Sequence, residues 1–280
     1  MKFRSIISGK QVPILGFGTW RLGGTMHPDT SQDSRIIAVL QAAIDMGYTH
    51  IDTAEMYGGG HTEELVGQAI RDFRRDQVQI VTKVWHTNLR YHDVFHAFEG
   101  STRRLGIEYI DFFAIHLPSA HIPLAETFRA LNELVDRGLV HHLGVSNFTT
   151  EQLKMAQEYA KTPIAISQAP CSLYNRKFLK GGLLTHCQQN NILMAAYSPF
   201  ERGDILENPV IEQIAHKYSA TPAQVALNWI SRQPSTMVYL MSLNLDHLKE
   251  NLGALELEFL PEDIRLLDEL EMPEEKLWPQ

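Results

Sequence analysis

Four side chains of types used in proton transfer follow apolar runs in the first half of the sequence: Asp52, Tyr57, Lys83 and His116. A tyrosine hydroxyl can donate a proton, and a nearby lysine, carboxylate or imidazole can change its pKa or hold a reacting oxygen. Taken singly, each residue has an ordinary structural explanation, because an aspartate at a strand end often caps a turn and a lone lysine or histidine often lies at the surface. The four side chains therefore predict an active site only if the fold brings their strand ends together.

The segments that would position these residues alternate between strands and helices. Short apolar or β-branched runs predict strands at residues 16–20, 48–52, 78–83, 109–116, 139–145, 164–168, 192–197 and 237–240. Apolar residues at helical spacing predict helices between them, at residues 36–44, 63–73, 94–105, 125–137, 149–160, 178–190, 222–230 and 244–254. Two of these helices begin with capping sequences, Thr149 to Gln152 and Thr221 to Gln224.

This alternation predicts the fold class. Strands joined to helices by short connections indicate a parallel sheet, and about eight such units predict a closed (β/α)8 TIM barrel. We expect a hairpin over residues 3–7 and 12–15 and extra helices near 209–218 and 261–270. No linker divides the sequence, so residues 1–280 are expected to form one barrel domain. An open doubly wound sheet is the alternative, although no Gly-x-Gly-x-x-Gly follows a strand. In a barrel, all four candidate residues would face the same end.

Composition and charge exclude several classes of protein. Hydrophobic residues make up 44 % of the 280 residues and charged residues 21 %, which is usual for a globular protein in water. The net charge of −8 argues against a binder of nucleic acid or of an anionic membrane. The first residues lack the apolar run of a signal peptide, and Cys171 and Cys187 suggest no disulfide framework, so we expect a cytoplasmic protein. His92 and His96 have no third ligand beside them, and no metal site is expected.

Several short motifs occur in a fixed order at the predicted strand ends. They are Gly47-Tyr48 through Asp52 to Tyr57, the strand ending at Lys83, Ile115-His116-Leu117-Pro118, Gly144-Val145-Ser146-Asn147-Phe148, Gln168, and Ala196-Tyr197-Ser198-Pro199. Each motif is modest alone, but the whole set at barrel spacing is specific. With these motifs the sequence resembles the aldo-keto reductases over nearly its whole length, from Gly16 to Asn251.

The resemblance implies an NAD(P)H-dependent oxidoreductase that reduces aldehydes or ketones to alcohols by hydride transfer from the nicotinamide C4. It implies that Tyr57 donates the proton, that Lys83 lowers the pKa of Tyr57, and that Asp52 holds Lys83. His116 would hydrogen-bond the carbonyl oxygen as a neutral group. By the same resemblance, the nicotinamide end of the cofactor would be held by Ser146, Asn147, Gln168 and Tyr197. The substrate pocket would be walled by Trp20 and Trp85. Substrate choice would lie in residues 117–123, 200–208 and the tail after 270.

The adenosine end of the cofactor is where the sequence departs from the family pattern. The resemblance assigns it to the start of the helix near residue 244, with the residues Ser242, Asn244, His247, Glu250 and Asn251. The family usually has a lysine where this chain has Met241 and an arginine where it has His247. Both missing cations would grip the 2′-phosphate of NADP, and a histidine is mostly uncharged at pH 7. We therefore expect NADP(H) to be favoured, with NAD(H) not excluded.

Two other functions remain open at the level of the sequence. A non-catalytic regulatory subunit could keep the barrel and its nicotinamide site, although the intact set of four polar residues argues against this. A Schiff-base aldolase could use Lys83 as its nucleophile, and borohydride trapping of a carbonyl substrate without nicotinamide would reveal it. The expected partner is a small carbonyl compound, and the expected assembly is a monomer or a weak oligomer.

Overall fold

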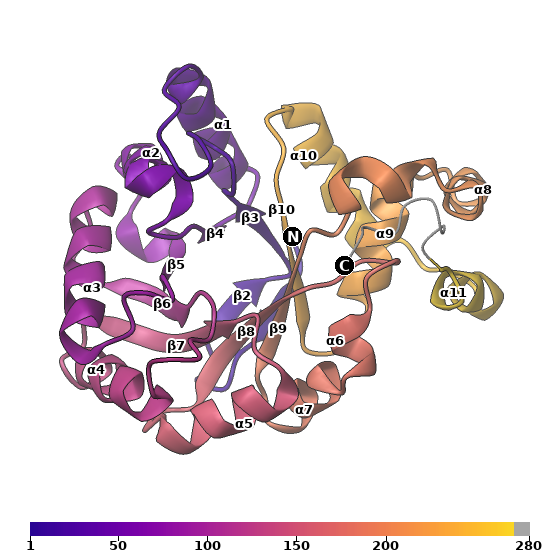
Figure 1. Cartoon of the computed structure of the whole chain (residues 1–280). Coiled ribbons are helices and arrows are strands. Elements are labelled where there is room, and N and C mark those ends of the chain that lie inside the picture. Colours follow the sequence, from indigo (N-terminus) through magenta and orange to yellow (C-terminus); the bar gives the residue numbers. More distant parts are fainter. Residues whose placement is uncertain (272–280) are drawn as a thin grey trace.

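The computed structural model describes residues 1–271, and their parallel strands close into a barrel (Figure 1). The barrel strands are β3 (Leu15–Gly18), β4 (His50–Asp52), β5 (Gln79–Val84), β6 (Ile110–Ile115), β7 (Val140–Ser146), β8 (Ile164–Pro170), β9 (Leu193–Tyr197) and β10 (Thr236–Leu240). Neighbours pair in chain order, and β10 pairs with both β9 and β3. The predicted (β/α)8 barrel is confirmed, and the open-sheet alternative is wrong.

Helices surround the barrel (Figure 1). They are α1 (Asp33–Asp45), α2 (His61–Ile70), α3 (Tyr91–Leu105), α4 (Leu124–Asp136), α5 (Thr150–Tyr159), α6 (Lys177–Lys180), α7 (Leu183–Gln189), α8 (Pro209–Lys217), α9 (Pro222–Ser231), α10 (Leu245–Leu252) and α11 (Pro261–Asp268). Short 3-10 helices add η1 (Tyr57–Gly60), η2 (Arg75–Gln77), η3 (Glu201–Glu207) and η4 (Gly253–Glu256). The extra helices expected near 209–218 and 261–270 are α8 and α11.

Local sequence sets where several helices begin. Thr149 and Thr221 each accept a hydrogen bond from the backbone of the glutamine three residues later, and that glutamine bonds back to the threonine amide. Both predicted capping boxes are therefore confirmed. The single helix predicted over residues 178–190 is wrong, because the chain forms α6 and α7 with a break at Gly181–Gly182. Two successive glycines disfavour a helix interior, which explains the break.

An amino-terminal hairpin covers one end of the barrel. Its strands β1 (Phe3–Ser5) and β2 (Gln11–Pro13) pair antiparallel, as predicted. Ile6 and Val12 from the hairpin belong to the same buried cluster as Phe112 and Met237, which point into the barrel. Figure 1 shows β2 lying across the middle of the ring. Side chains thus fill the amino end of the barrel, and the polar residues described below gather at the carboxyl ends of the strands.

Two sequence expectations concern the limits of the chain. Most of the tail after residue 270, expected to take part in substrate choice, lies outside the described residues. Within residues 1–271, no helix combines the length and the apolar character needed to cross a membrane.

Candidate active site

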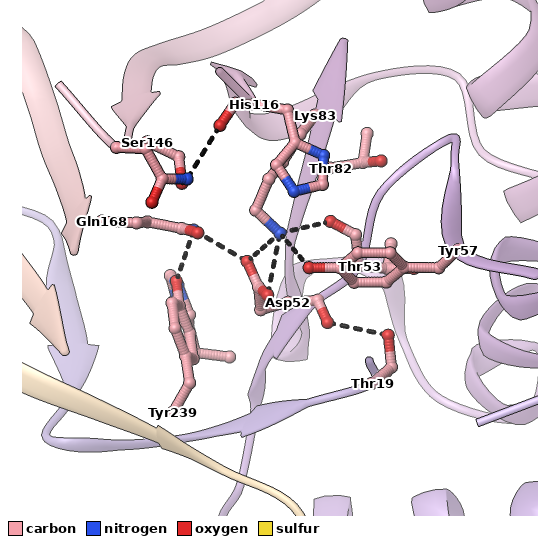
Figure 2. A network of polar contacts seen from close by, with 12 residues as sticks. Thr19, Asp52, Thr53, Tyr57, Thr82, Lys83, His116, Ser146, Gln168 and Tyr239 are labelled. Carbon is pink, nitrogen blue, oxygen red and sulfur yellow. Dashed lines mark hydrogen bonds and ion pairs between the residues drawn. The ribbon is translucent and has the colours of Figure 1, made fainter. Parts of the chain in front are cut away.

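Lys83 lies at the centre of a buried polar cluster at the carboxyl ends of β4 and β5 (Figure 2). Its ammonium is 2.8 Å from both carboxylate oxygens of Asp52. It also lies 2.8 Å from the backbone oxygen of Thr53 and 3.3 Å from the hydroxyl oxygen of Tyr57. An ammonium has three N–H donors, so these three partners use all of them. The Tyr57 oxygen is thus an acceptor from Lys83, and its own O–H remains to be donated.

A tight turn holds Tyr57 in this position. The chain enters η1 at Tyr57, and Gly58 there has a φ of +59°. A Cβ on Gly58 would lie only 2.7 Å from the backbone oxygen of Gly23, so the turn requires glycine at this position. The Tyr57 ring packs against Trp20, with 4.8 Å between ring centroids, and meets His116 edge-on at 5.6 Å. The glycine-rich segment is therefore a defined turn that places the hydroxyl beside Lys83.

The overall shift of the Tyr57 pKa is opposite in direction to the lowering that was predicted from Lys83 alone. Burial raises the pKa of the Tyr57 hydroxyl well above its usual value, and the Asp52 carboxylate raises it further. Asp52 touches the Lys83 ammonium directly, so it offsets the positive charge that was expected to favour the tyrosinate. Tyr57 is accordingly protonated at neutral pH, which is the form that a proton donor needs.

The buried ion pair itself is balanced between burial and attraction. Burial raises the pKa of the Asp52 carboxyl and lowers the pKa of the Lys83 ammonium. The positive charge of Lys83 opposes the rise in the Asp52 pKa, and the negative charge of Asp52 opposes the fall in the Lys83 pKa. Gln168 donates a further hydrogen bond to Asp52. Removing one partner would leave a buried charge without compensation, which costs far more than the pair contributes.

His116 lies directly after β6 and is held in its neutral form. Burial, together with the charge on Lys83, lowers the pKa of His116 to about 3. Its ring meets Trp85 edge-on, with 4.9 Å between centroids. The buried Nδ1 atom of His116 has no hydrogen-bond partner in the described part of the chain. A neutral imidazole with an unused nitrogen beside the Tyr57 ring fits the predicted contact with a ligand oxygen.

Asn147 joins three of the predicted cofactor residues to the site. Its amide nitrogen donates to the backbone oxygen of His116 at 3.1 Å and to the Ser146 hydroxyl at 2.9 Å. Its amide oxygen accepts from the Tyr197 hydroxyl at 2.6 Å. Both N–H donors of Asn147 are therefore used inside the protein, and only one lone pair of its oxygen remains. The structure brings Ser146, Asn147 and Tyr197 together and fixes the Tyr197 ring.

Gln168, the fourth predicted contact to the nicotinamide end, bonds to the buried polar cluster around Lys83 through Asp52. Its Nε2 atom lies 2.7 Å from Asp52 Oδ1 and 3.5 Å from the hydroxyl oxygen of Tyr239 (Figure 2). Gln168 is 2 % exposed and Tyr239 is 3 % exposed. Tyr239 was missed in the sequence. The alternation along its strand could have shown that it points into the barrel, because residues of a barrel strand face inward at every second position.

Another missed residue, Glu55, holds the loop that carries Trp85. Its Oε1 atom accepts hydrogen bonds from the Trp85 backbone N–H at 2.5 Å and from the Asn88 side chain at 3.0 Å. The Trp85 ring contacts His116, and the ring of Trp20, which is 40 % exposed, contacts Tyr57. The two tryptophans therefore lie on either side of the pair formed by His116 and Tyr57. The position of Glu55 between Asp52 and Tyr57 in the sequence was the available signal.

The residues predicted for the adenosine end lie at the start of α10 and along it. Asn244 caps α10, since its side chain accepts from the Asp246 amide at 2.9 Å, and Ser242 accepts from the Asn244 amide at 3.0 Å. Glu250 instead accepts from the Thr221 hydroxyl at 2.7 Å, which ties α10 to α9. The buried Oδ1 atom of Asn251 lacks a hydrogen-bond partner among residues 1–271. That unused acceptor fits a ligand held at this helix.

Positions 241 and 247, where the family usually has cations, are open to solvent, and an arginine from α1 contacts the loop between them. Met241 is 43 % exposed, and His247 is exposed on α10. Arg35, on α1, donates to the backbone oxygen of Leu243 at 3.3 Å. No local pattern in the sequence connects position 35 to position 243, so this cation was missed.

Comparisons with known proteins agree with this geometry. A model of the aldo/keto reductase family matches residues 14–272. The methylglyoxal reductase YeaE of Escherichia coli is 33 % identical over 263 residues, covering 92 % of this chain and 90 % of that protein. The solved structure of a thermostable aldo-keto reductase, Tm1743, in complex with the inhibitor epalrestat, has a TM-score of 0.93 and 41 % identity, covering 96 % of this chain and 99 % of that one. An aldo/keto reductase from Klebsiella pneumoniae, in complex with NADP and acetate, has a TM-score of 0.85 and 34 % identity, covering 94 % and 93 %.

Proposed function

The chain belongs to the aldo/keto reductase family and is a nicotinamide-dependent carbonyl reductase, in which we propose that Tyr57 donates the proton to the carbonyl oxygen. One observation carries the assignment of Tyr57. Lys83 uses its three N–H groups on Asp52, Thr53 and the Tyr57 oxygen, so the Tyr57 O–H is left for a reacting group. Among the described residues, the Tyr57 hydroxyl has no hydrogen-bond partner besides Lys83.

A nicotinamide cofactor, when bound, would supply the hydride that reduces the carbonyl carbon. As negative charge develops on the carbonyl oxygen, Tyr57 gives it a proton and His116 gives it a hydrogen bond. The phenolate left on Tyr57 is then stabilised by the Lys83 ammonium 3.3 Å away, so Lys83 acts on the product of the proton transfer. Asp52 keeps Lys83 in place and charged.

The residues at the nicotinamide end fit a carboxamide and an aromatic ring. Gln168 Oε1 and the remaining lone pair of Asn147 are acceptors, and the Ser146 hydroxyl is a donor. Tyr197 offers a ring face fixed by its bond to Asn147. At the other end, the unpaired Oδ1 of Asn251 can accept from an adenine amino group.

For cofactor choice, we propose that NADPH binds with a reduced margin over NADH. The 2′-phosphate carries roughly −1.5 to −2 charge at pH 7. Met241 offers it no charge, while the amides at the start of α10 and the Ser242 hydroxyl remain available. Arg35 can contribute part of the missing charge, because its guanidinium already contacts the loop at Leu243.

Restoring the two missing cations should favour NADPH alone. In Met241→Lys with His247→Arg, the 2′-phosphate would gain two charge-assisted contacts of about 1.5–3 kcal/mol each. We expect the dissociation constant of NADPH to fall at least about tenfold and that of NADH to stay nearly unchanged. Titration of each cofactor against protein fluorescence measures both values.

A matched control makes the same replacements elsewhere. Met155 on α5 and His96 on α3 are exposed, so Met155→Lys with His96→Arg adds equal charge away from α10. This variant should leave the ratio of the two dissociation constants unchanged. In a separate variant, Arg35→Gln, the binding of NADPH should weaken more than the binding of NADH. Equal tightening of both cofactors by the α10 variant would show that the 2′-phosphate is held elsewhere.

A panel of aldehydes, ketones and sugars, assayed with NADPH and NADH in parallel, tests the reductase function directly. The panel should include methylglyoxal, because a relative at 33 % identity is named a methylglyoxal reductase. Apolar carbonyl compounds are expected to be favoured, since we propose that Trp20 and Trp85 wall the substrate site. A parallel sample with borohydride and no nicotinamide reports on the aldolase alternative.

A further inference from the structure

A chain of side-chain hydrogen bonds continues from Asp52 down the inside of the barrel. Gln168 Nε2 donates to Asp52 Oδ1 at 2.7 Å and lies 3.5 Å from the hydroxyl oxygen of Tyr239. The Tyr239 hydroxyl lies 2.8 Å from Nε2 of His50. All four residues are at most 6 % exposed. Figure 2 shows the upper part of this chain, with Tyr239 below Gln168. The contacts connect the active-site ion pair to residues that point into the middle of the barrel.

The lower end of the chain fixes which way its hydrogen bonds run. Gln79 donates from Nε2 to the backbone oxygen of Gln11 at 2.7 Å, so its Oε1 faces Nδ1 of His50 at 3.0 Å. Nδ1 of His50 must therefore carry a hydrogen and donate to Gln79. Burial lowers the pKa of His50 to about 4, so the ring is neutral and its Nε2 is an acceptor. Tyr239 accordingly donates its O–H to His50.

The same reasoning sets the orientation of the Gln168 amide. Because the Tyr239 hydroxyl donates its hydrogen to His50, its oxygen can act only as an acceptor toward Gln168. Burial raises the pKa of Tyr239 well above its usual value, so the hydroxyl stays protonated. The Asp52 carboxylate also accepts only. Both hydrogens of Gln168 Nε2 are thus directed at acceptors, and Oε1 faces away from them.

We propose that Tyr239 and His50 are positioning residues that lock the Gln168 amide with its nitrogen toward Asp52 and its oxygen available to the carboxamide of the nicotinamide cofactor. This inference rests on the proposed function of Gln168 as a cofactor contact. No donor within residues 1–271 reaches Gln168 Oε1, so its lone pairs are available to a ligand. A rotated amide would place that oxygen against the Asp52 carboxylate and remove the acceptor from the cofactor side.

The packing of the barrel holds Tyr239 in the position that this lock needs. Its ring stacks on His50, with 5.7 Å between centroids and 20° between the planes. On the neighbouring strand β3, a Cβ on Gly16 would lie 2.8 Å and 2.9 Å from two carbons of the Tyr239 ring. Gly16 therefore provides the space that the Tyr239 ring occupies.

The first test removes only the Tyr239 hydroxyl. Tyr239→Phe leaves one N–H of Gln168 and Nε2 of His50 without partners, so the Gln168 amide can rotate. We expect the dissociation constants of NADPH and NADH to rise together, by about 3- to 10-fold, because the two cofactors share the nicotinamide end. KM for the carbonyl substrate should change little. Fluorescence titration and steady-state kinetics measure these quantities separately.

A double-mutant cycle separates positioning from general damage to the fold. In Gln168→Ala there is no amide left to orient, so adding Tyr239→Phe should not weaken cofactor binding further. If the double mutant shows the full additional loss, Tyr239 does not act through Gln168 and the proposal is wrong. An unchanged cofactor affinity in the single Tyr239→Phe variant would also overturn it.

His50 supplies a second, independent pair of variants. His50→Gln can place an amide oxygen near the position of Nε2 and should keep cofactor affinity close to that of the natural chain. His50→Leu has no acceptor and should match Tyr239→Phe. Thr127→Val, which removes a buried hydroxyl of α4 that donates to the backbone oxygen of Leu89, is the control for lost stability and should leave cofactor binding unchanged.

Cofactor binding and carbonyl reduction, measured on the natural chain, distinguish failure of this proposal from failure of the proposed function. If neither NADPH nor NADH binds to it, the cofactor site itself is wrong. If both cofactors bind and carbonyls are reduced, but His50→Leu and Tyr239→Phe bind them normally, only the positioning role is wrong.

Discussion

Tyr57→Phe should lose nearly all carbonyl reduction while it still binds NADPH. The substitution removes the hydroxyl that accepts a hydrogen bond from Lys83 and keeps the ring that packs against Trp20 and His116. A positioned general acid typically contributes about 10²–10⁴-fold to the rate, so we expect a fall of that order in kcat on the best substrate. Steady-state rates together with fluorescence titration of NADPH separate lost chemistry from lost binding.

Tyr91→Phe is the matched control for this experiment. It removes a tyrosine hydroxyl that bonds to Glu133 between the outer helices α3 and α4, and its ring packs on His92, Phe95 and Arg129 and not on the site residues. Its kcat should stay close to that of the natural chain. Near-normal turnover in Tyr57→Phe would mean that another group donates the proton.

Lys83→Met should reduce turnover strongly and move the pH dependence in a defined direction. Reduction needs protonated Tyr57, so the rate falls as pH rises through the pKa of Tyr57. The Lys83 ammonium favours the phenolate, and removing it raises that pKa further, so the alkaline limb of kcat/KM should move to higher pH. Loss of one partner from a buried ion pair also costs about 3–5 kcal/mol of stability, which thermal unfolding measures.

Asp52→Asn is the milder comparison. The amide can still accept from Lys83 at short distance but carries no charge, so we expect a smaller loss of turnover than in Lys83→Met. An alkaline limb that stays in place in Lys83→Met would show that Lys83 does not act on Tyr57.

The sequence predicted the barrel and the meeting of Asp52, Tyr57 and Lys83, because both follow from local patterns. Hydrophobic periodicity marks the elements, and parallel strands in a barrel end on the same side. The electrostatics of Tyr57 could not be predicted in this way. The direction of the Tyr57 pKa shift depends on burial and on the distance from Lys83 to Asp52, and residue spacing in the sequence gives neither quantity.

Contacts between distant positions were likewise beyond the reach of the sequence. Arg35 meets Leu243 across the junction of α1 and the β10–α10 loop, and Gln168 meets Asp52 across the barrel interior. A resemblance to a family transfers only the residues that match its motifs. Tyr239 and Arg35 belong to no such motif. Strand alternation could indicate that Tyr239 points into the barrel, but its contact with Gln168 and that of Arg35 with Leu243 follow only from the folded chain.

The close fit between Gly16 and the Tyr239 ring constrains how this barrel can evolve. A side chain at position 16 cannot be accepted while the ring stands less than 3 Å from its Cβ. Position 239 would have to become smaller first, and only then could position 16 gain a methyl group. The two substitutions are therefore tolerated in one order and not in the other. Among natural descendants of this chain, a larger residue at 16 should be found only together with a smaller one at 239.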